Sequence, residues 1–341
     1  MQRLIQSDLT KVILFFILTI VTAAAISPWL YNAGMLLAEV RESRSLNPIL
    51  DSLADCCNGV TFSSFYLCSM LGCALVLAGP FVMWCQLKHP SSGTIYKPWR
   101  LQLPRSSISG NNGQSLSRNP QADLHLGAGF LIMGGVMAIS FLLLKKIGWF
   151  SMNPEADYGM AVGYAMVSAI FTAIISESLF RGVIMGICLR SMGPALAIIS
   201  SSVIYATVLS VTPPKELVLK NPEMVDAGFR MLKVTLQQLL TPEKFAFGFI
   251  TLFSFGLVMA YARYRTASLW LPIGLHIGMT FSQHFLEQTT VANTQLPAIS
   301  KLLIGGNTLS GLLPLCILIV TTLLIHIFIQ ISRPKPDTDS S

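Results

Sequence analysis

Two charged residues, Glu177 and Arg181, lie inside an apolar stretch of the chain. They are four residues apart, so on a helix they share one face and can form an ion pair. A charged side chain at the centre of a membrane helix costs about 2.5–3.5 kcal/mol to insert and usually marks a functional site. A carboxylate in this position can act as a general base, but an ion pair that joins helices explains the same residues. The spacing alone leaves both interpretations open.

A second polar group lies on a later apolar stretch. His276, Thr280 and His284 follow one another at intervals of four, which places them on one stripe of a helix. Two histidines on one face favour an internal polar surface over exposure to lipid. A zinc site made of Glu177, His276 and His284 is unsupported, because eight residues separate the histidines, whereas zinc-protease histidines are about four apart. We therefore expect neither a metal nor another cofactor.

Ser176 offers another possibility, because it directly precedes Glu177. A serine hydroxyl paired with His276 as its base is the arrangement of many nucleophilic enzymes. Such a pair needs a third group that orients the histidine, and the sequence does not identify one.

These residues fall in three motifs that resemble the signatures of the CAAX-protease and bacteriocin-processing (Abi, CPBP) family. Residues 176–182, Ser-Glu-Ser-Leu-Phe-Arg-Gly, resemble its Glu-Glu-x-x-x-Arg motif. The family's Phe-x-x-x-His motif is matched by Tyr205 in the phenylalanine place and Leu209 in the histidine place. Its His-x-x-x-Asn motif is matched by His276 and Thr280. The motifs lie in the order that the family shows.

The resemblance covers about residues 125–290 and implies an intramembrane endopeptidase site with substituted groups. In the family, the first glutamate is thought to activate water, and two histidines and the asparagine hold the water and the developing oxyanion. The substituted positions are Ser176 for this glutamate, Leu209 for one histidine and Thr280 for the asparagine. Because acid–base and oxyanion groups each commonly contribute about 10²-fold or more, we expect a degenerate, weakly active or inactive member.

Such a member is expected to bind a peptide, a lipid-linked substrate or a membrane-protein partner in the intramembrane cavity that holds the active site in the family. Glu177 and His276 are the candidate catalytic residues, and Arg181 has a structural role in the family. The alternative is an active endopeptidase, of CAAX or bacteriocin-processing type, in which Glu177 and His276 activate water.

The composition indicates a membrane environment for these motifs. Hydrophobic residues make up 52% of the 341 residues and charged residues 11%, and the mean hydropathy is +0.62. Globular proteins have about 25% charged residues, so this chain must find its solvent in lipid. The formal net charge of +7 is dispersed along the sequence, which suggests basic loops beside anionic lipid and no nucleic-acid partner.

Eight stretches are apolar enough to cross a bilayer as helices. They centre on residues 12–32, 59–84, 125–144, 159–189, 194–212, 245–262, 267–286 and 309–331. We therefore predict an all-α, polytopic membrane protein with about eight transmembrane helices. The absence of an internal repeat argues against a second alternative, a transporter or channel. The first stretch is expected to remain as an anchor, with a cleaved signal peptide as the alternative.

The stretches divide the chain into an N-terminal hairpin with a polar linker (1–124), a CAAX-protease-like core (125–290) and a last span with a polar tail (291–341). Basic residues after the sixth and eighth stretches favour cytoplasmic termini. The resemblance to bacterial Abi-type proteins suggests a bacterial inner membrane.

An amphipathic helix is predicted at about residues 222–240. Its apolar positions recur at intervals of three and four at Val225, Phe229, Leu232, Leu236 and Leu239. Such a helix either lies on the membrane or packs with its apolar face against the protein's own bundle, and we favour the bundle.

Overall fold

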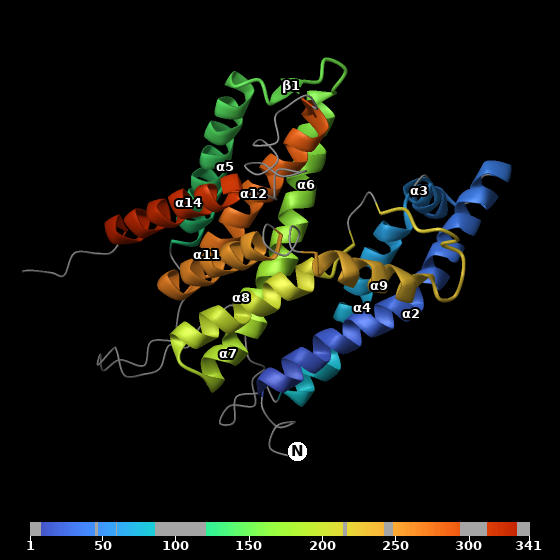
Figure 1. Cartoon of the computed structure of the whole chain (residues 1–341), viewed down its shortest axis with the longest axis horizontal. Helices are drawn as coiled ribbons and strands as arrows, with labels where there is room; N and C mark the ends of the chain where they lie inside the picture. Colours follow the sequence, from blue (N-terminus) through green and yellow to red (C-terminus); the bar gives the residue numbers. More distant parts are fainter. Residues whose placement is uncertain are drawn as a thin grey trace, which may run out of the picture. The chain divides into compact units, whose positions relative to one another are not determined.

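The protein is built almost entirely of helices in the computed structural model (Figure 1). The structure describes residues 8–44, 47–58, 60–85, 121–213, 217–241, 248–293 and 312–332. Each of the eight apolar stretches contains a helix, which confirms the prediction of an all-α membrane protein. Most of the predicted polar linker at 86–123, and the polar tail after residue 332, lie outside the described residues.

The chain forms two compact units. The first comprises residues 1–96 and 206–246, and the second comprises residues 97–205 and 247–341. The first unit holds α2 (Asp8–Ser43), α3 (Pro48–Cys57), α4 (Phe62–Trp84) and α9 (Ala227–Leu239). The second unit holds α5 (Ala122–Lys146), α6 (Tyr158–Glu177), the π-helix η2 (Ser178–Ile184), α7 (Met185–Ser191), α11 (Ile250–Thr266), α12 (Trp270–Thr289) and α14 (Leu312–Ile331). Helix α8 (Pro194–Ser210) begins in the second unit and ends in the first. The three-part division of the sequence stays a prediction.

Five helices in the described part of the chain are long and apolar enough to cross a membrane. They are α2, α4, α5, the continuous run α6–η2–α7 and α14. Helices α8 and α11 have 17 residues each, and α12 carries the polar stripe of His276, Thr280 and His284. Crossing of the bilayer by all eight predicted stretches therefore stays a prediction for these three helices.

In the first unit, α2 and α4 form an antiparallel pair. Phe15 of α2 stacks on Phe81 of α4, with ring centroids 4.5 Å apart. Toward the opposite end of the pair, Tyr31 of α2 packs edge-on against Phe62 and Phe65, at 5.4 Å from each. These aromatic contacts fix the register of the two helices.

Helix α9 packs against α2 in the same unit (Figure 1), but mainly through another face than the predicted one, of which Leu232 packs against the core. Its buried residues are Ala227, Gly228, Met231 and Thr235. The bulky apolar residues Val225, Phe229 and Leu236 are exposed instead, which corrects the predicted packing. Small residues let two helix backbones approach closely, so the small face rather than the large apolar face meets α2. The helix also begins later than predicted, at Ala227, because residues 222–226 form turns that follow Asn221 with its left-handed φ of 52°.

Gly228→Val is expected to weaken the α2–α9 contact by about 2–3 kcal/mol. A methyl group on Gly228 would already collide with the Ala24 carbonyl oxygen, and that backbone atom cannot rotate away. The measurement is thermal unfolding in detergent, together with limited proteolysis of the chain around α9. Gln237→Val, at an exposed position of the same helix, is the matched control and should melt like the parent. Equal melting of both variants would contradict the close contact.

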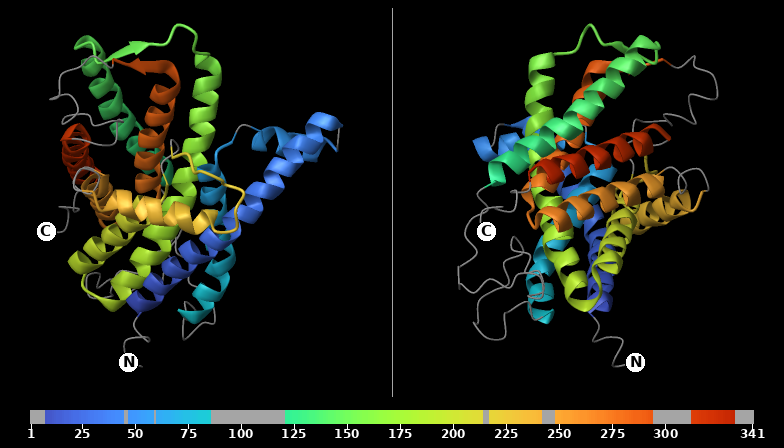
Figure 2. Two further views of the ribbon diagram at one scale, coloured as in Figure 1. Left: turned by 45° about the vertical axis from the view of Figure 1, so that its right-hand side comes forward. Right: turned by 90° about the vertical axis from the view of Figure 1, so that its left-hand side faces the viewer.

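In the second unit, α12 packs against both α5 and α6 (Figures 1 and 2). Glycines allow the backbones of α5 and α12 to meet. A methyl group on Gly129 would lie 2.6 Å from the Leu271 carbonyl oxygen, and one on Gly278 would lie 2.8 Å from the Phe130 carbonyl oxygen. Close helix contact through small residues is typical of membrane bundles.

Helix α6 turns a stripe of alanines toward the interior. Ala161, Ala165, Ala169 and Ala173 follow at intervals of four, and all are buried. Ala169 and Ala173 pack in one core cluster with Ile273 and Ile277 of α12 and with Leu269. Glu177 is the next position on this stripe, so the packing face of α6 carries its carboxylate inward.

A short strand pair joins the start of α6 to the end of α12 (Figure 2). Strand β1 (Phe150–Met152) pairs antiparallel with β2 (Thr290–Ala292), with Ser151 opposite Val291. Three residues per strand give too little periodic signal for a prediction from sequence. The pair fixes one end of α6 and of α12 side by side.

Candidate functional site

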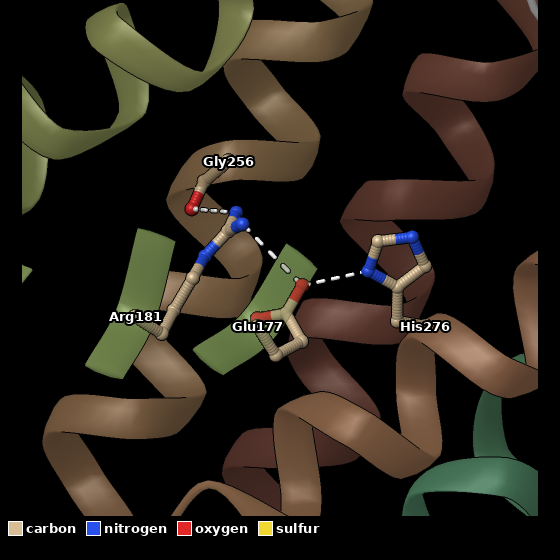
Figure 3. Close-up of polar contacts among 4 residues, drawn as sticks. All are labelled: Glu177, Arg181, Gly256 and His276. Atoms are coloured by element: carbon tan, nitrogen blue, oxygen red, sulfur yellow. Dashed lines mark hydrogen bonds and ion pairs between the residues drawn. The ribbon is translucent and has the colours of Figure 1, made fainter. Parts of the chain in front are cut away.

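Glu177 and His276 meet in the interior of the second unit (Figure 3). Glu177 ends α6 and is 0% exposed, and His276 lies in the second turn of α12 and is 6% exposed. The distance from Glu177 Oε1 to His276 Nδ1 is 2.6 Å, between residues 99 positions apart in the chain. The two candidate catalytic residues therefore form one buried pair.

Arg181 contacts the same carboxylate oxygen from the opposite side (Figure 3). Its Nη1 lies 3.3 Å from Glu177 Oε1, and its Nη2 donates a hydrogen bond of 3.3 Å to the Gly256 carbonyl oxygen in α11. The ion pair predicted from the spacing of four residues is present. Arg181 lies within η2, and π-helical turns of this kind occur frequently at functional sites.

Aromatic rings enclose the three polar groups. The Arg181 guanidinium carbon lies 4.2 Å from the centroid of the Tyr205 ring, which is a cation–π contact. Phe180 packs edge-on against Tyr205 with ring centroids 4.9 Å apart. On the other side, Phe255 meets the His276 ring edge-on at 5.3 Å. The polar cluster is thus surrounded by apolar surface.

The hydrogen bond to Glu177 identifies Nδ1 as the donor nitrogen of the His276 ring. An ionised carboxylate only accepts hydrogen bonds, so in its ion pair with Arg181 the Glu177 carboxylate accepts from His276 Nδ1–H. When the imidazole is neutral, this donation leaves its lone pair on Nε2. Glu177 therefore orients His276. It is the kind of orienting group that the sequence alone did not identify.

The second oxygen of Glu177 differs from the first. Oε2 is buried and has no hydrogen-bond partner within the described residues. The hydroxyl of Ser178, the next residue, is in the same situation. Buried acceptors are normally satisfied by protein or by ordered water, so a donor at Oε2 is expected.

The residues at the substituted family positions carry no acid or base. Ser176 is half-buried, and its side chain interacts with that of Tyr205. Leu209 follows Tyr205 by one turn of α8 and is half-buried. Thr280 follows His276 by one turn of α12 and is buried.

Two contributors to the site were not predicted from the sequence, Phe255 and Gly256 of α11. A methyl group on Gly256 would lie 3.0 Å from Ser202 Cβ, so this glycine lets α8 and α11 approach one another. A glycine in the middle of an apolar helix is a signal of close packing and marks this position in the sequence.

The zinc trio considered from sequence is not assembled. His284 Nδ1 lies 3.5 Å from Glu287 Oε2, and its ring packs edge-on near Tyr164 at 6.1 Å. Across the described ranges, no group of three or more His, Cys, Asp or Glu side chains is placed to hold a metal ion.

The comparison with known families agrees with this geometry. Residues 159–282 match the family model of the type II CAAX prenyl endopeptidase Rce1-like proteins, and this range includes η2, α8, α11 and His276. No curated protein and no solved structure matches the chain. The protein is therefore an integral membrane protein whose residues 159–282 are similar to the Rce1-like type II CAAX prenyl endopeptidases.

Proposed function

We propose that the protein is a degenerate family member that binds a peptide, a lipid-linked molecule or a membrane-protein partner and does not cleave it. The observation that supports this proposal is the occupation of Glu177 Oε1 by both Arg181 and His276. A general base needs an accessible lone pair near the proton that it removes. An oxygen held by two donors in a buried site is a poor base.

The substitutions support the same conclusion. The base position holds Ser176, whose hydroxyl is far less basic than a carboxylate at neutral pH. Leu209 offers no hydrogen-bond donor for a developing oxyanion, and Thr280 offers one hydroxyl. Because acid–base and oxyanion groups are each commonly worth about 10²-fold or more, their loss is expected to remove most of the family's activity.

The proposal includes a cellular setting. The lipid bilayer is the solvent of the helices, and the ligand is of the membrane-associated kind that a CAAX prenyl endopeptidase recognises. We place the protein in a bacterial inner membrane because its motifs resemble those of bacterial Abi-type proteins. Both termini are placed in the cytoplasm because of the basic residues after the sixth and eighth stretches. Neither a nucleic acid nor a cofactor is part of the proposed function.

A second candidate function is slow hydrolysis by Glu177 and His276. Glu177 Oε2 has no hydrogen-bond partner within the described residues, so it can accept a hydrogen bond from a water molecule. Orientation of His276 by Oε1 leaves Nε2 as a proton acceptor. This geometry favours the candidate, whereas Arg181 already occupies Oε1 of the same carboxylate as an ion-pair partner.

The purified protein is expected to bind a fluorescent farnesylated CAAX peptide without cleaving it. Turnover is measured by mass spectrometry in proteoliposomes, and binding by fluorescence anisotropy, for the parent, Glu177→Gln and His276→Ala. Glu287→Gln changes an exposed glutamate of α12 and is the matched control. Parent turnover that persists in the control and disappears in both site variants would establish the second candidate. Equal turnover in all four proteins would identify a contaminant, and absence of saturable binding would refute the binding proposal for this ligand.

A further inference from the structure

One bulky apolar face of α9 is largely exposed, although Leu232 on the same side packs against the core of the first unit. With the turns that flank the helix, the exposed face consists of Val225, Phe229, Leu236 and Leu240, whose exposed fractions are 69%, 46%, 41% and 79%. The spacings of four, seven and four residues place these side chains on one stripe of a helix. This stripe is hereafter the apolar stripe of α9.

The other two faces of α9 are already accounted for. The small face is packed on α2 through Ala227, Gly228, Met231 and Thr235. At 100° per residue, the apolar stripe lies about 120° around the helix from this small face. Lys233 and Gln237 are exposed on the third, polar face. A helix with one anchored face, one apolar face and one basic, polar face fits a boundary between lipid and water.

The Arg230 side chain binds the turn that precedes α9 and does not extend into the surroundings. Its guanidinium donates hydrogen bonds to the carbonyl oxygens of Lys220 and Asn221, and its Nε lies 3.1 Å from Asp226 Oδ2. The turn that precedes α9 is thereby fixed, so that Val225 is held in line with the stripe. Among the described residues around α9, Lys220 and Lys233 are exposed basic residues available for contact with lipid phosphates.

The depth of α9 along α2 follows from its contacts. A methyl group on Gly228 would meet Ala24 and Ser27 of α2. Tyr31 packs against Phe62, the first residue of α4, which marks the end of the α2–α4 pair. At 1.5 Å per residue, Ala24 and Ser27 lie about 6–10 Å inside this end. Interfacial helices bury their apolar face at about 5–10 Å, so α9 lies at the matching level if the end of the α2–α4 pair lies at the membrane surface.

We propose that α9 is an interfacial membrane helix whose apolar stripe inserts among lipid acyl chains while Lys233 faces anionic headgroups. The contact with α2, which is itself long and apolar enough to span the bilayer, places this stripe beside lipid. The inference does not depend on the proposed ligand or on the state of Glu177. The alternative occupant of the apolar stripe is another protein surface, and lipid quenching distinguishes lipid from protein at this position.

The test compares Phe229→Trp with Gln237→Trp in the full chain. Each variant is reconstituted into vesicles of phosphatidylcholine and phosphatidylglycerol, with and without phosphatidylcholine brominated near the top of the acyl chain. The parent signal, which contains five tryptophans, is subtracted. We expect bromolipid to quench the added tryptophan at 229 at least twofold more than at 237, and aqueous acrylamide to show the reverse order. Both positions are exposed, so the fold should survive.

Equal bromolipid quenching at the two positions would overturn the proposal. Protection of the tryptophan at 229 from both bromolipid and acrylamide would also overturn it, because a protein surface would then cover the stripe. Leu236→Trp and Lys233→Trp form a second pair with the same expected order, in case either first variant loses its cooperative melting transition.

Discussion

Glu177→Ala is expected to destabilise the protein by about 3–5 kcal/mol, because it leaves the Arg181 charge buried without its partner. His276 Nδ1–H loses its acceptor in the same change, which adds the cost of a buried unsatisfied donor. The effect is measured as a fall in the melting temperature of the purified protein in detergent. A fall of several degrees, with the parent and variant at equal concentration, is the expected result.

Two controls separate loss of the pair from loss of a glutamate. Glu287→Ala removes an exposed carboxylate and is expected to change stability by less than about 0.5 kcal/mol. Replacement of both partners, as Glu177→Leu with Arg181→Met, removes both charges and is expected to be milder than Glu177→Ala. If Glu177→Ala melts with the parent, Glu177 and Arg181 do not form a buried ion pair.

Gly274→Val is expected to have the largest effect on folding, a loss of at least about 4 kcal/mol. A methyl group on Gly274 of α12 would collide with the Leu126 carbonyl oxygen and would lie 3.0 Å from the Phe130 backbone nitrogen of α5. Both are backbone atoms, so no change of rotamer relieves the overlap and the helices must separate. Ordinary overpacking of side chains costs about 1–3 kcal/mol. The cost here is larger because Gly129 and Gly278 make further close backbone contacts along the same α5–α12 interface, so the two long helices cannot separate locally.

The measurement is the yield of monodisperse protein after size-exclusion chromatography, followed by thermal melting of what is recovered. Gly135→Val is the matched control on the partner helix, because Gly135 is exposed and no atom lies within 4 Å of a methyl group built there. Comparable yield and melting of the two variants would show that α5 and α12 are not in close contact.

The sequence predicts those parts of the fold that depend on local pattern. Apolar stretches alone locate the membrane helices, and the spacing of Glu177 and Arg181 predicts their ion pair. The contact between Glu177 and His276 needs the family motifs as well, because 99 positions separate the two residues and no periodicity links them. Gly256 shows the limit of prediction from sequence. Its backbone carbonyl oxygen accepts a hydrogen bond from Arg181, and nothing in its residue type indicates that bond.

The packing face of α9 was predicted wrongly for a physical reason. In water, the apolar side of an amphipathic helix is buried in the core, and Phe229 and Leu236 were placed there by that rule. In lipid, apolar side chains gain nothing by leaving the solvent, and close packing selects small residues such as Gly228. The alanine stripe that ends at Glu177 follows the same rule, so small residues at intervals of four are the better guide in this chain.

The β1–β2 pair limits how far α6 can rotate about the end that it holds. It holds α6 at the end opposite to Glu177, and the 20 residues of that helix form a rigid arm of about 30 Å. A rotation of about 2° at the strand pair would move the Glu177 carboxylate sideways by about 1 Å over such an arm. A shift of that size takes a 2.6 Å contact with His276 to beyond ordinary hydrogen-bonding distance. The strand pair at one end of α6, and the packing of Ala169 and Ala173 against α12 near the other end, together limit such a rotation.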